Sequence, residues 1–294
     1  MINPEEFGKA GPPNLKKPPG LFITDFDGTL LRSDRTVADN DLVALKNLGR
    51  RGFVRSIATG RSFHSFKTVA GADLPIDYVI FSTGAGVCHH PTRRIIRKTA
   101  LEAAEVQRAM QVLLAAGLDF MVHRPIPDNH VFAYWGSPGD NPDFQKRLAL
   151  YRPYAFPLDQ SGDGFGPATQ LLAVVPAPQS KRALGIVRRE LPDLSIIQTT
   201  SPLDGQSTWI EIFPPSVSKS LTAAWLTAAL GIRPRDVLAV GNDFNDLDLL
   251  EWSGTSFVVS NAPEALKRRF PAVASHDEAG VAEAVARWLA TPSQ

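Results

Sequence analysis

The chain of 294 residues predicts an α/β fold in which a parallel sheet is interrupted by an inserted α+β module. Two short apolar runs, 21–24 and 53–58, flank a segment whose apolar residues repeat with helical spacing, which is the pattern of a strand–helix–strand unit. Between about residues 98 and 212 the pattern changes to strand-like runs joined by turns, with helices between them. A buried-strand pattern returns at 237–240. The core is therefore expected to form from two segments of the chain, with the module between them.

The composition argues against several classes of partner. The net charge is +1, with 31 basic and 30 acidic residues, so no overall field attracts nucleic acid or an anionic membrane. No apolar run approaches the roughly 18 residues of a membrane span. The single cysteine, Cys88, allows neither an intrachain disulfide nor a cysteine zinc cluster. We therefore expect no nucleic-acid or membrane partner, and the sequence leaves the oligomeric state open.

Residues 1–19 are rich in proline and glycine and contain no apolar segment of the kind found in a signal peptide. This composition predicts a flexible N-terminal tail. In the absence of a targeting segment, we expect a cytoplasmic location.

Two aspartates follow the first predicted strand, in the stretch Asp25-Phe26-Asp27-Gly28. Residues two apart on a strand point to the same face, so the two carboxylates are expected to lie close together at an apolar strand end. Such a pair is unfavourable unless a cation, a shared proton or hydrogen bonds compensate. The simplest compensation is a hard divalent cation, typically Mg²⁺. The alternative is a solvated Asp-Gly turn, which is common.

The next elements complete the predicted edge of the sheet. A helix over 38–51 leads to the strand 53–58, which runs into Thr59-Gly60-Arg61. Because the strands of such a unit are parallel, this turn and the aspartates lie at the same edge of one sheet. The residues alone predict that Thr59 caps the following helix, which does not exclude a further role for its hydroxyl. A third strand, 78–81, precedes a turn that contains Thr83.

The inserted module has its own elements. Its predicted helices are 101–116, 142–150 and 180–190, and its predicted strands are 119–123, 130–135, 170–175, 194–199 and 207–213. The loop 159–167 is rich in glycine and aspartate, and we interpret it as a mobile surface loop in preference to a loop that grips a substrate.

The chain returns to the core through Pro214-Pro215 and places Lys219 at the start of a helix that ends near Gly231. A helix dipole disfavours a cation at this end, so a lysine there is favourable if an anion lies beside it. The next strand, 237–240, ends in the polar stretch 241–246, which contains Asn242, Asp243, Asn245 and Asp246. A last strand, 256–259, and a helix, 280–289, complete the core.

These four polar stretches, in this order, resemble the motifs of the haloacid dehalogenase (HAD) superfamily of phosphotransferases. The module is similar to the cap of the type IIB (Cof-like) branch. The resemblance implies a Rossmann-like parallel-sheet core, 20–97 and 213–294, with an inserted α+β cap of the C2B type, 98–212.

The resemblance also implies roles for individual residues. Asp25 is the nucleophile, Asp27 is the general acid and base, and Thr59 and Lys219 offset the charge of the transferring phosphoryl group. The residues implied to contact substrate or phosphate are Gly28, Thr29, Thr59, Gly60, Arg61, Lys219 and Asn245. The residues implied to hold Mg²⁺ are Asp25, Asp27 and Asp246, together with Asn242, through its amide oxygen, or its neighbour Asp243. The sequence departs from the family at Asn242, where relatives carry a metal-binding aspartate, and at Thr83, where they often carry asparagine.

The expected function is a Mg²⁺-dependent phosphatase that hydrolyses small phosphomonoesters, such as sugar phosphates, through an aspartyl-phosphate. The second aspartate, Asp27, favours phosphoryl transfer because dehalogenases of the superfamily lack it. Two alternatives are a phosphomutase that uses the same residues and a non-catalytic module that binds a phosphorylated ligand. The substrate depends on cap side chains that the sequence does not place.

Overall fold

The computed structural model describes residues 17–136, 141–158 and 165–290, which fall into two compact units. The first unit contains residues 17–61, 65–97 and 218–290, and the second contains residues 62–64 and 98–217 within the described ranges. Most of the predicted tail, 1–19, and of the predicted loop, 159–167, lies outside the described residues.

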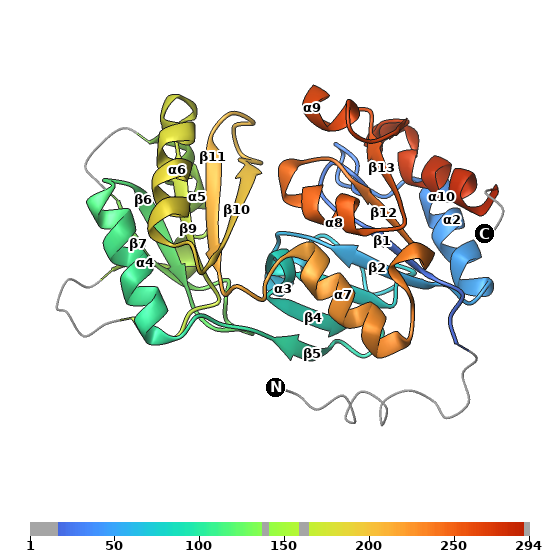
Figure 1. Ribbon diagram of the computed structural model, residues 1–294, viewed down its shortest axis with the longest axis horizontal. Coiled ribbons are helices and arrows are strands. Elements are labelled where there is room, and N and C mark those ends of the chain that lie inside the picture. The colour runs from blue at the N-terminus through green and yellow to red at the C-terminus, as the bar shows by residue number, and fades with distance from the viewer. Residues whose placement is uncertain (1–16, 137–140, 159–164, 291–294) are drawn as a thin grey trace. The chain divides into compact units, whose positions relative to one another are not determined.

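The first unit is built on an eight-stranded sheet with the order β14-β13-β12-β1-β2-β3-β4-β5. Its neighbouring strands β13, β12, β1 and β2 are labelled in Figure 1. The sheet is parallel from β14 through β3 in this order, as predicted. The next strand, β4, is antiparallel to β3. The strands are β1 Leu21–Thr24, β2 Val54–Ala58, β3 Tyr78–Phe81, β4 Gly86–His89, β5 Arg94–Lys98, β12 Val237–Gly241, β13 Thr255–Val259 and β14 Ala272–Val273.

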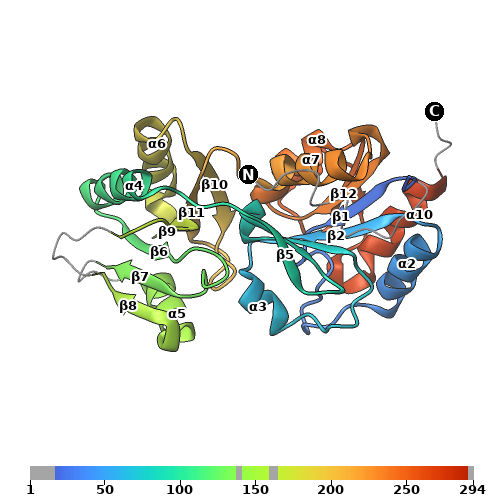
Figure 2. The same cartoon turned by 90° about the horizontal axis from the view of Figure 1, so that it is seen from below.

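Helices cover both faces of this sheet. Figure 2 shows α7 and α8 on one face and α2 and α10 on the other. Every residue of β1 is fully buried, which is the pattern of a central strand in a sheet covered on both sides. The helices of this part of the chain are α2 Asp39–Arg50, α3 Phe63–Lys67, α7 Lys219–Leu230, α8 Leu247–Trp252, α9 Glu264–Lys267 and α10 Gly280–Ala290.

The second unit has a six-stranded sheet with the order β10-β11-β9-β6-β7-β8, antiparallel except where β7 pairs with β8. Apolar residues of α4 and α6 pack on one face of the sheet, and Phe144 of α5 packs on the other. The elements are α4 Ala103–Ala115, β6 Asp119–His123, β7 Phe132–Trp135, α5 Pro142–Leu150, β8 Ala155–Pro157, β9 Gln170–Val175, α6 Ser180–Glu190, β10 Ser195–Thr200 and β11 Thr208–Phe213. The inserted α+β module is confirmed as a separate sheet with helices on both faces.

Five short elements among the described residues were not predicted: β4, β5, β8, α9 and β14. β5 and β14 lie at the edges of the first sheet, and β8 lies at an edge of the second. Edge strands tolerate charged and short sequences, as in Arg94-Ile95-Ile96-Arg97-Lys98, so their pattern differs from that of a buried strand. Within the residues that the structure describes, none of the helices combines the length and apolar composition of a membrane span.

Candidate active site

The polar stretches predicted at strand ends come together because their strands are neighbours. β12, β1 and β2 are adjacent and parallel, so the residues after their last positions lie at the same edge of the sheet. Asp25 follows β1, Thr59 follows β2 and Asn242 follows β12. Lys219 reaches this edge as the first residue of α7, whose N-cap is the Ser218 side chain, which accepts a hydrogen bond from the Leu221 N–H.

The Lys219 ammonium group bridges two buried carboxylates. Its Nζ donates to Asp25 Oδ1 at 2.6 Å and to Asp246 Oδ1 at 2.5 Å. The Lys219 side chain is fully buried, and Asp246 is too. With all three groups ionised the cluster carries a charge of −1 away from water, so a second cation beside it would be favourable.

Burial dominates the electrostatics of this cluster. Desolvation raises the pKa of Asp25 to about 7, against the opposing effect of the Lys219 ammonium and with a further increase from the Asp246 carboxylate. Burial lowers the pKa of Lys219, but the carboxylates of Asp246 and Asp25 outweigh it, so the pKa of Lys219 is raised. Lys219 is therefore charged at neutral pH.

Asp246 has hydrogen-bond donors on both carboxylate oxygens. Its Oδ1 faces Lys219, and its Oδ2 accepts the backbone N–H groups of Asn242 at 2.9 Å and Asp243 at 3.1 Å. The Asp243 side chain turns back to cap the short helix η5, Phe244–Asp246. Asp246 thus ties the loop after β12 to the lysine of α7.

Asp27 is held by Arg61. The guanidinium donates from Nε to Asp27 Oδ2 at 2.7 Å and from Nη2 to Oδ1 at 2.6 Å, which is a bidentate pair. Arg61 Nη1 also donates to Ser65 Oγ at 3.0 Å. The Asp27 side chain is 40% exposed, in contrast to Asp25. The two aspartates therefore have different environments and different basic partners, which the sequence pattern alone did not indicate.

Thr59 closes a turn and does not cap a helix. Its hydroxyl accepts the Arg61 N–H at 3.1 Å, whereas α3 begins only at Phe63, so the predicted capping role is wrong. A side chain at Gly60 would lie next to the Thr83 hydroxyl, 3.6 Å away, and the Asn245 amide, 4.0 Å away. Gly60, Asn245 and Thr83 therefore border one another. Thr83 has a φ of 55°, a left-handed conformation that is strained for a β-branched residue.

Gly28 lies directly against Asn242. It has a φ of +71°, and a Cβ atom there would lie 2.7 Å from Asn242 Nδ2, so both conformation and space require glycine. The next residue, Thr29, is fully buried, and its hydroxyl forms no hydrogen bond within the described residues. The side chain of Asn261, which sequence reasoning did not single out, donates from Nδ2 to the Gly28 carbonyl at 2.9 Å.

The oxygen atoms at this edge suit a hard divalent cation better than a soft one. Asp25 and Asp27 offer carboxylates, Asn242 offers an amide oxygen, and the backbone carbonyls of the loop are further hard donors. Within the described residues, no group of three or more His, Cys, Asp or Glu side chains is arranged to hold a metal by itself. Any cation bound here would therefore need amide or backbone oxygens as well as carboxylates.

Comparisons of the sequence and of the fold with known proteins agree on one family. The family model for haloacid dehalogenase-like hydrolases matches residues 22–285. The chain is 24% identical over 277 residues to 5-amino-6-(5-phospho-D-ribitylamino)uracil phosphatase YwtE of Bacillus subtilis (strain 168), covering 88% of this chain and 94% of that protein. It is also 24% identical over 287 residues to HMP-PP phosphatase of Yersinia enterocolitica, covering 92% and 96%. Its fold matches that of the HAD subclass IIB sugar phosphatase BT4131 with a TM-score of 0.70, at 17% identity and over 92% and 98% of the two chains.

Proposed function

Because the chain belongs to the haloacid dehalogenase-like hydrolase family and is a phosphatase of that family, we propose that it hydrolyses small phosphomonoesters with Mg²⁺ through an aspartyl-phosphate on Asp25. The observation that carries this proposal is the buried pair of Asp25 and Lys219 at the edge of the parallel sheet. We propose that residues 20–97 and 218–290 form the catalytic core and residues 98–217 a cap domain. The boundary expected at residue 213 moves to 218, because Phe213 pairs with Ser195 in the second sheet.

The proposed reaction has two displacements at phosphorus. An Asp25 oxygen attacks the phosphorus, the bond to the ester oxygen breaks, and the leaving alcohol takes a proton from Asp27. A water molecule then attacks the phosphorus of the aspartyl-phosphate and gives a proton to Asp27, which releases inorganic phosphate and restores Asp25. Lys219 offsets the negative charge that develops on the phosphoryl oxygens during both steps.

Arg61 must move away from Asp27 before Asp27 can transfer a proton to the leaving group, because the guanidinium occupies both carboxylate oxygens. Two oxygens of a phosphoryl group can likewise accept a bidentate pair of hydrogen bonds from the guanidinium. We propose that Arg61 exchanges Asp27 for the substrate phosphate, so that substrate binding frees the Asp27 carboxyl group to face the leaving oxygen. We propose that the phosphate has four further contacts: Thr59, the backbone amides around Gly60, the Gly28-Thr29 turn and Asn245.

Mg²⁺ would be held by the Asp25 carboxylate, by the backbone carbonyl of Asp27 and by the side chain of Asn242. Bound there, the ion would neutralise charge on the transferring phosphoryl group and the surplus charge of the carboxylates. We favour the Asn242 amide oxygen over Asp243 because the Asp243 side chain caps η5. Asp246 would not contact the metal directly, because its two carboxylate oxygens accept hydrogen bonds from Lys219 and from the backbone N–H groups of the loop.

For the substrate class, we propose phosphorylated sugars or related small metabolites. The support is the similarity to phosphatases of small phosphorylated compounds, among them the two enzymes named above and a sugar phosphatase of the same fold. Identities of 17–24% do not carry a substrate from one protein to another, so a panel of compounds has to be tested.

Release of inorganic phosphate from a panel of phosphorylated metabolites is the direct test. We expect release in the presence of Mg²⁺ and loss of release with EDTA, restored by excess Mg²⁺. Recovery of an isomeric phosphate ester without free phosphate would favour a phosphomutase. Binding of phosphorylated compounds without any turnover, by folded protein with Mg²⁺ present, would favour the non-catalytic alternative.

Changing Asn242 to aspartate tests which residue binds the metal. Asn242→Asp adds a negative ligand, so we expect the Mg²⁺ concentration for half-maximal activity to fall on the order of 10-fold. The matched variant Asp243→Asn keeps a good capping residue for η5 and should leave the Mg²⁺ requirement unchanged. A higher Mg²⁺ requirement in Asp243→Asn, together with no change in Asn242→Asp, would assign the ligand to Asp243.

A further inference from the structure

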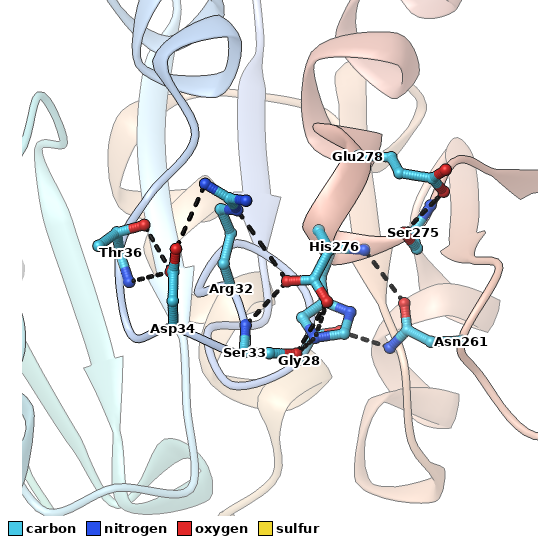
Figure 3. A network of polar contacts seen from close by, with 10 residues as sticks. Gly28, Arg32, Ser33, Asp34, Thr36, Asn261, Ser275, His276 and Glu278 are labelled. Carbon is cyan, nitrogen blue, oxygen red and sulfur yellow. Dashed lines mark hydrogen bonds and ion pairs between the residues drawn. The ribbon is translucent and has the colours of Figure 1, made fainter.

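The turn that follows Asp27 is anchored by a side chain from a distant segment. Asn261 lies just after β13, and its amide forms two hydrogen bonds in opposite directions (Figure 3). Its Nδ2 donates to the Gly28 carbonyl at 2.9 Å, and its Oδ1 accepts the His276 N–H at 3.1 Å. A carbonyl only accepts and a backbone N–H only donates, so the partners fix the orientation of the amide.

The other end of the same turn is held by the short helix η6, His276–Glu278. Asp277 Oδ1 accepts the Ser33 N–H at 2.9 Å, and Oδ2 accepts the Ser33 hydroxyl at 2.8 Å. His276 Nε2 lies 3.0 Å from the same hydroxyl. The start of η6 is itself fixed by a capping box between Ser275 and Glu278. Figure 3 shows these contacts as one network from Gly28 to Glu278.

Gly28 connects this network to the reacting groups. It follows Asp27 in the chain, and its Cα lies against the Asn242 side chain, from which a Cβ would be 2.7 Å away. In the sheet, β12 lies between β13 and β1, so Asn261 reaches from the end of β13 to the loop after β1, past the end of β12. A shift of the Gly28 backbone would therefore move both Asp27 and Asn242.

We propose that Asn261 is a positioning residue for phosphoryl transfer, which rests on the proposed function. Its amide holds the Gly28 carbonyl so that Asp27 and Asn242 stay aligned with Asp25, and Asp277 holds the far end of the turn through Ser33. These bonds lie near the surface, where hydrogen bonds add little to stability. Alignment of reacting groups is far more sensitive, because a displacement of about 1 Å can lower a rate about 100-fold.

Two substitutions of Asn261 test this role with p-nitrophenyl phosphate and Mg²⁺. Asn261→Asp is nearly isosteric: it keeps the acceptor for the His276 N–H but replaces the donor to Gly28 by an oxygen. Asn261→Ala removes both contacts without adding charge. For both variants we expect kcat to fall on the order of 10- to 100-fold, with KM changed less than about 3-fold and the thermal midpoint nearly unchanged.

Asp34→Ala is the matched control. Asp34 accepts two hydrogen bonds from Thr36 within the same loop, at 2.9 Å and 2.6 Å, and pairs with Arg32 at 3.5 Å; none of these three contacts involves Asn261 or Gly28. It should retain the kcat of the wild type. Equal losses of kcat in Asp34→Ala and Asn261→Ala would mean that any loosening of the loop has this effect, and would overturn the specific role of Asn261.

Different results would overturn the positioning role of Asn261 and the proposed phosphatase function. Wild-type kcat in both Asn261 variants, with Asp25→Asn inactive, would overturn the positioning role and leave the phosphatase intact. A rise in KM at unchanged kcat would also overturn it, because the residue would then serve binding alone. Full activity of Asp25→Asn would overturn the proposed mechanism, and the positioning role with it.

Discussion

Replacing Asp25 with asparagine is expected to lower phosphate release by at least about 10⁴-fold while the protein remains folded. The amide of asparagine cannot form the covalent intermediate. The fold should survive because the change removes a buried charge: Asp25, Asp246 and Lys219 together carry −1, whereas Asp246 and Lys219 alone form a neutral pair at 2.5 Å.

The stability of this variant should depend on pH in a defined direction. The pKa of Asp25 is raised from 3.8 to about 7, with burial as the main cause, so the folded wild type binds more protons than the unfolded chain within that window. Its stability therefore falls as the pH rises from about 4 to about 7. Asp25→Asn lacks this loss, so in metal-free buffer its stability relative to the wild type should increase across the same window.

Asp41→Asn is the matched control for the chemical change. Asp41 of α2 is also fully buried, burial raises its pKa to about 6, and it accepts the Ala282 N–H at 2.7 Å. In urea unfolding, the stability of Asp41→Asn relative to the wild type should also increase with pH. Its turnover should be that of the wild type. Activity of Asp25→Asn within 100-fold of the wild type, after exclusion of deamidation by mass spectrometry, would remove Asp25 as the nucleophile.

Much of the site follows from local patterns. Buried strands followed by polar turns predict which residues reach the edge of a parallel sheet, and this placed Asp25, Thr59 and Asn242 at neighbouring strand ends. Lys219 was identified from its resemblance to a motif, and a helix start explains how it reaches the same edge. The positions of the buried strands along the chain and the inserted module were predictable for the same reason, because burial imposes a strong periodicity.

Contacts between side chains were not predictable in the same way. Arg61 pairs with Asp27 across 34 residues, and Asn261 contacts Gly28 across 233 residues. Neither contact leaves a pattern in the local sequence, because each depends on how loops approach one another after the sheet has formed. These two contacts affect the active-site groups directly. The first pairs Asp27 with a guanidinium, and the second fixes the backbone of the turn that follows Asp27.

Replacing Lys219 with methionine should affect both stability and rate. The two buried carboxylates of Asp25 and Asp246 would lose the ammonium that lies 2.6 Å and 2.5 Å from them. Breaking a buried ion pair by removing one partner costs about 3–5 kcal/mol. Loss of the cation at the phosphoryl group should lower kcat on the order of 10³-fold.

The sign of the pH dependence distinguishes electrostatics from packing. The Lys219 ammonium lowers the pKa of Asp25, so its removal raises that pKa further. Protonation of a carboxylate then offsets the missing cation, and the loss of stability should be smaller at pH 5 than at pH 8 in urea unfolding. A loss that is equal at both pH values would indicate a packing defect instead.

A second substitution separates the structural part of Lys219 from its catalytic part. In Lys219→Met combined with Asp246→Asn, one of the two unpaired carboxylates is gone, so a large part of the stability should return. The rate should not return, because the phosphoryl group still lacks its cation.

Lys267→Met, which removes a surface ion pair with Glu264, should alter stability far less and leave kcat unchanged. Recovery of kcat in the double variant would show that Lys219 acts only by balancing Asp246, and would transfer the stabilisation of the phosphoryl group to other cations at the site.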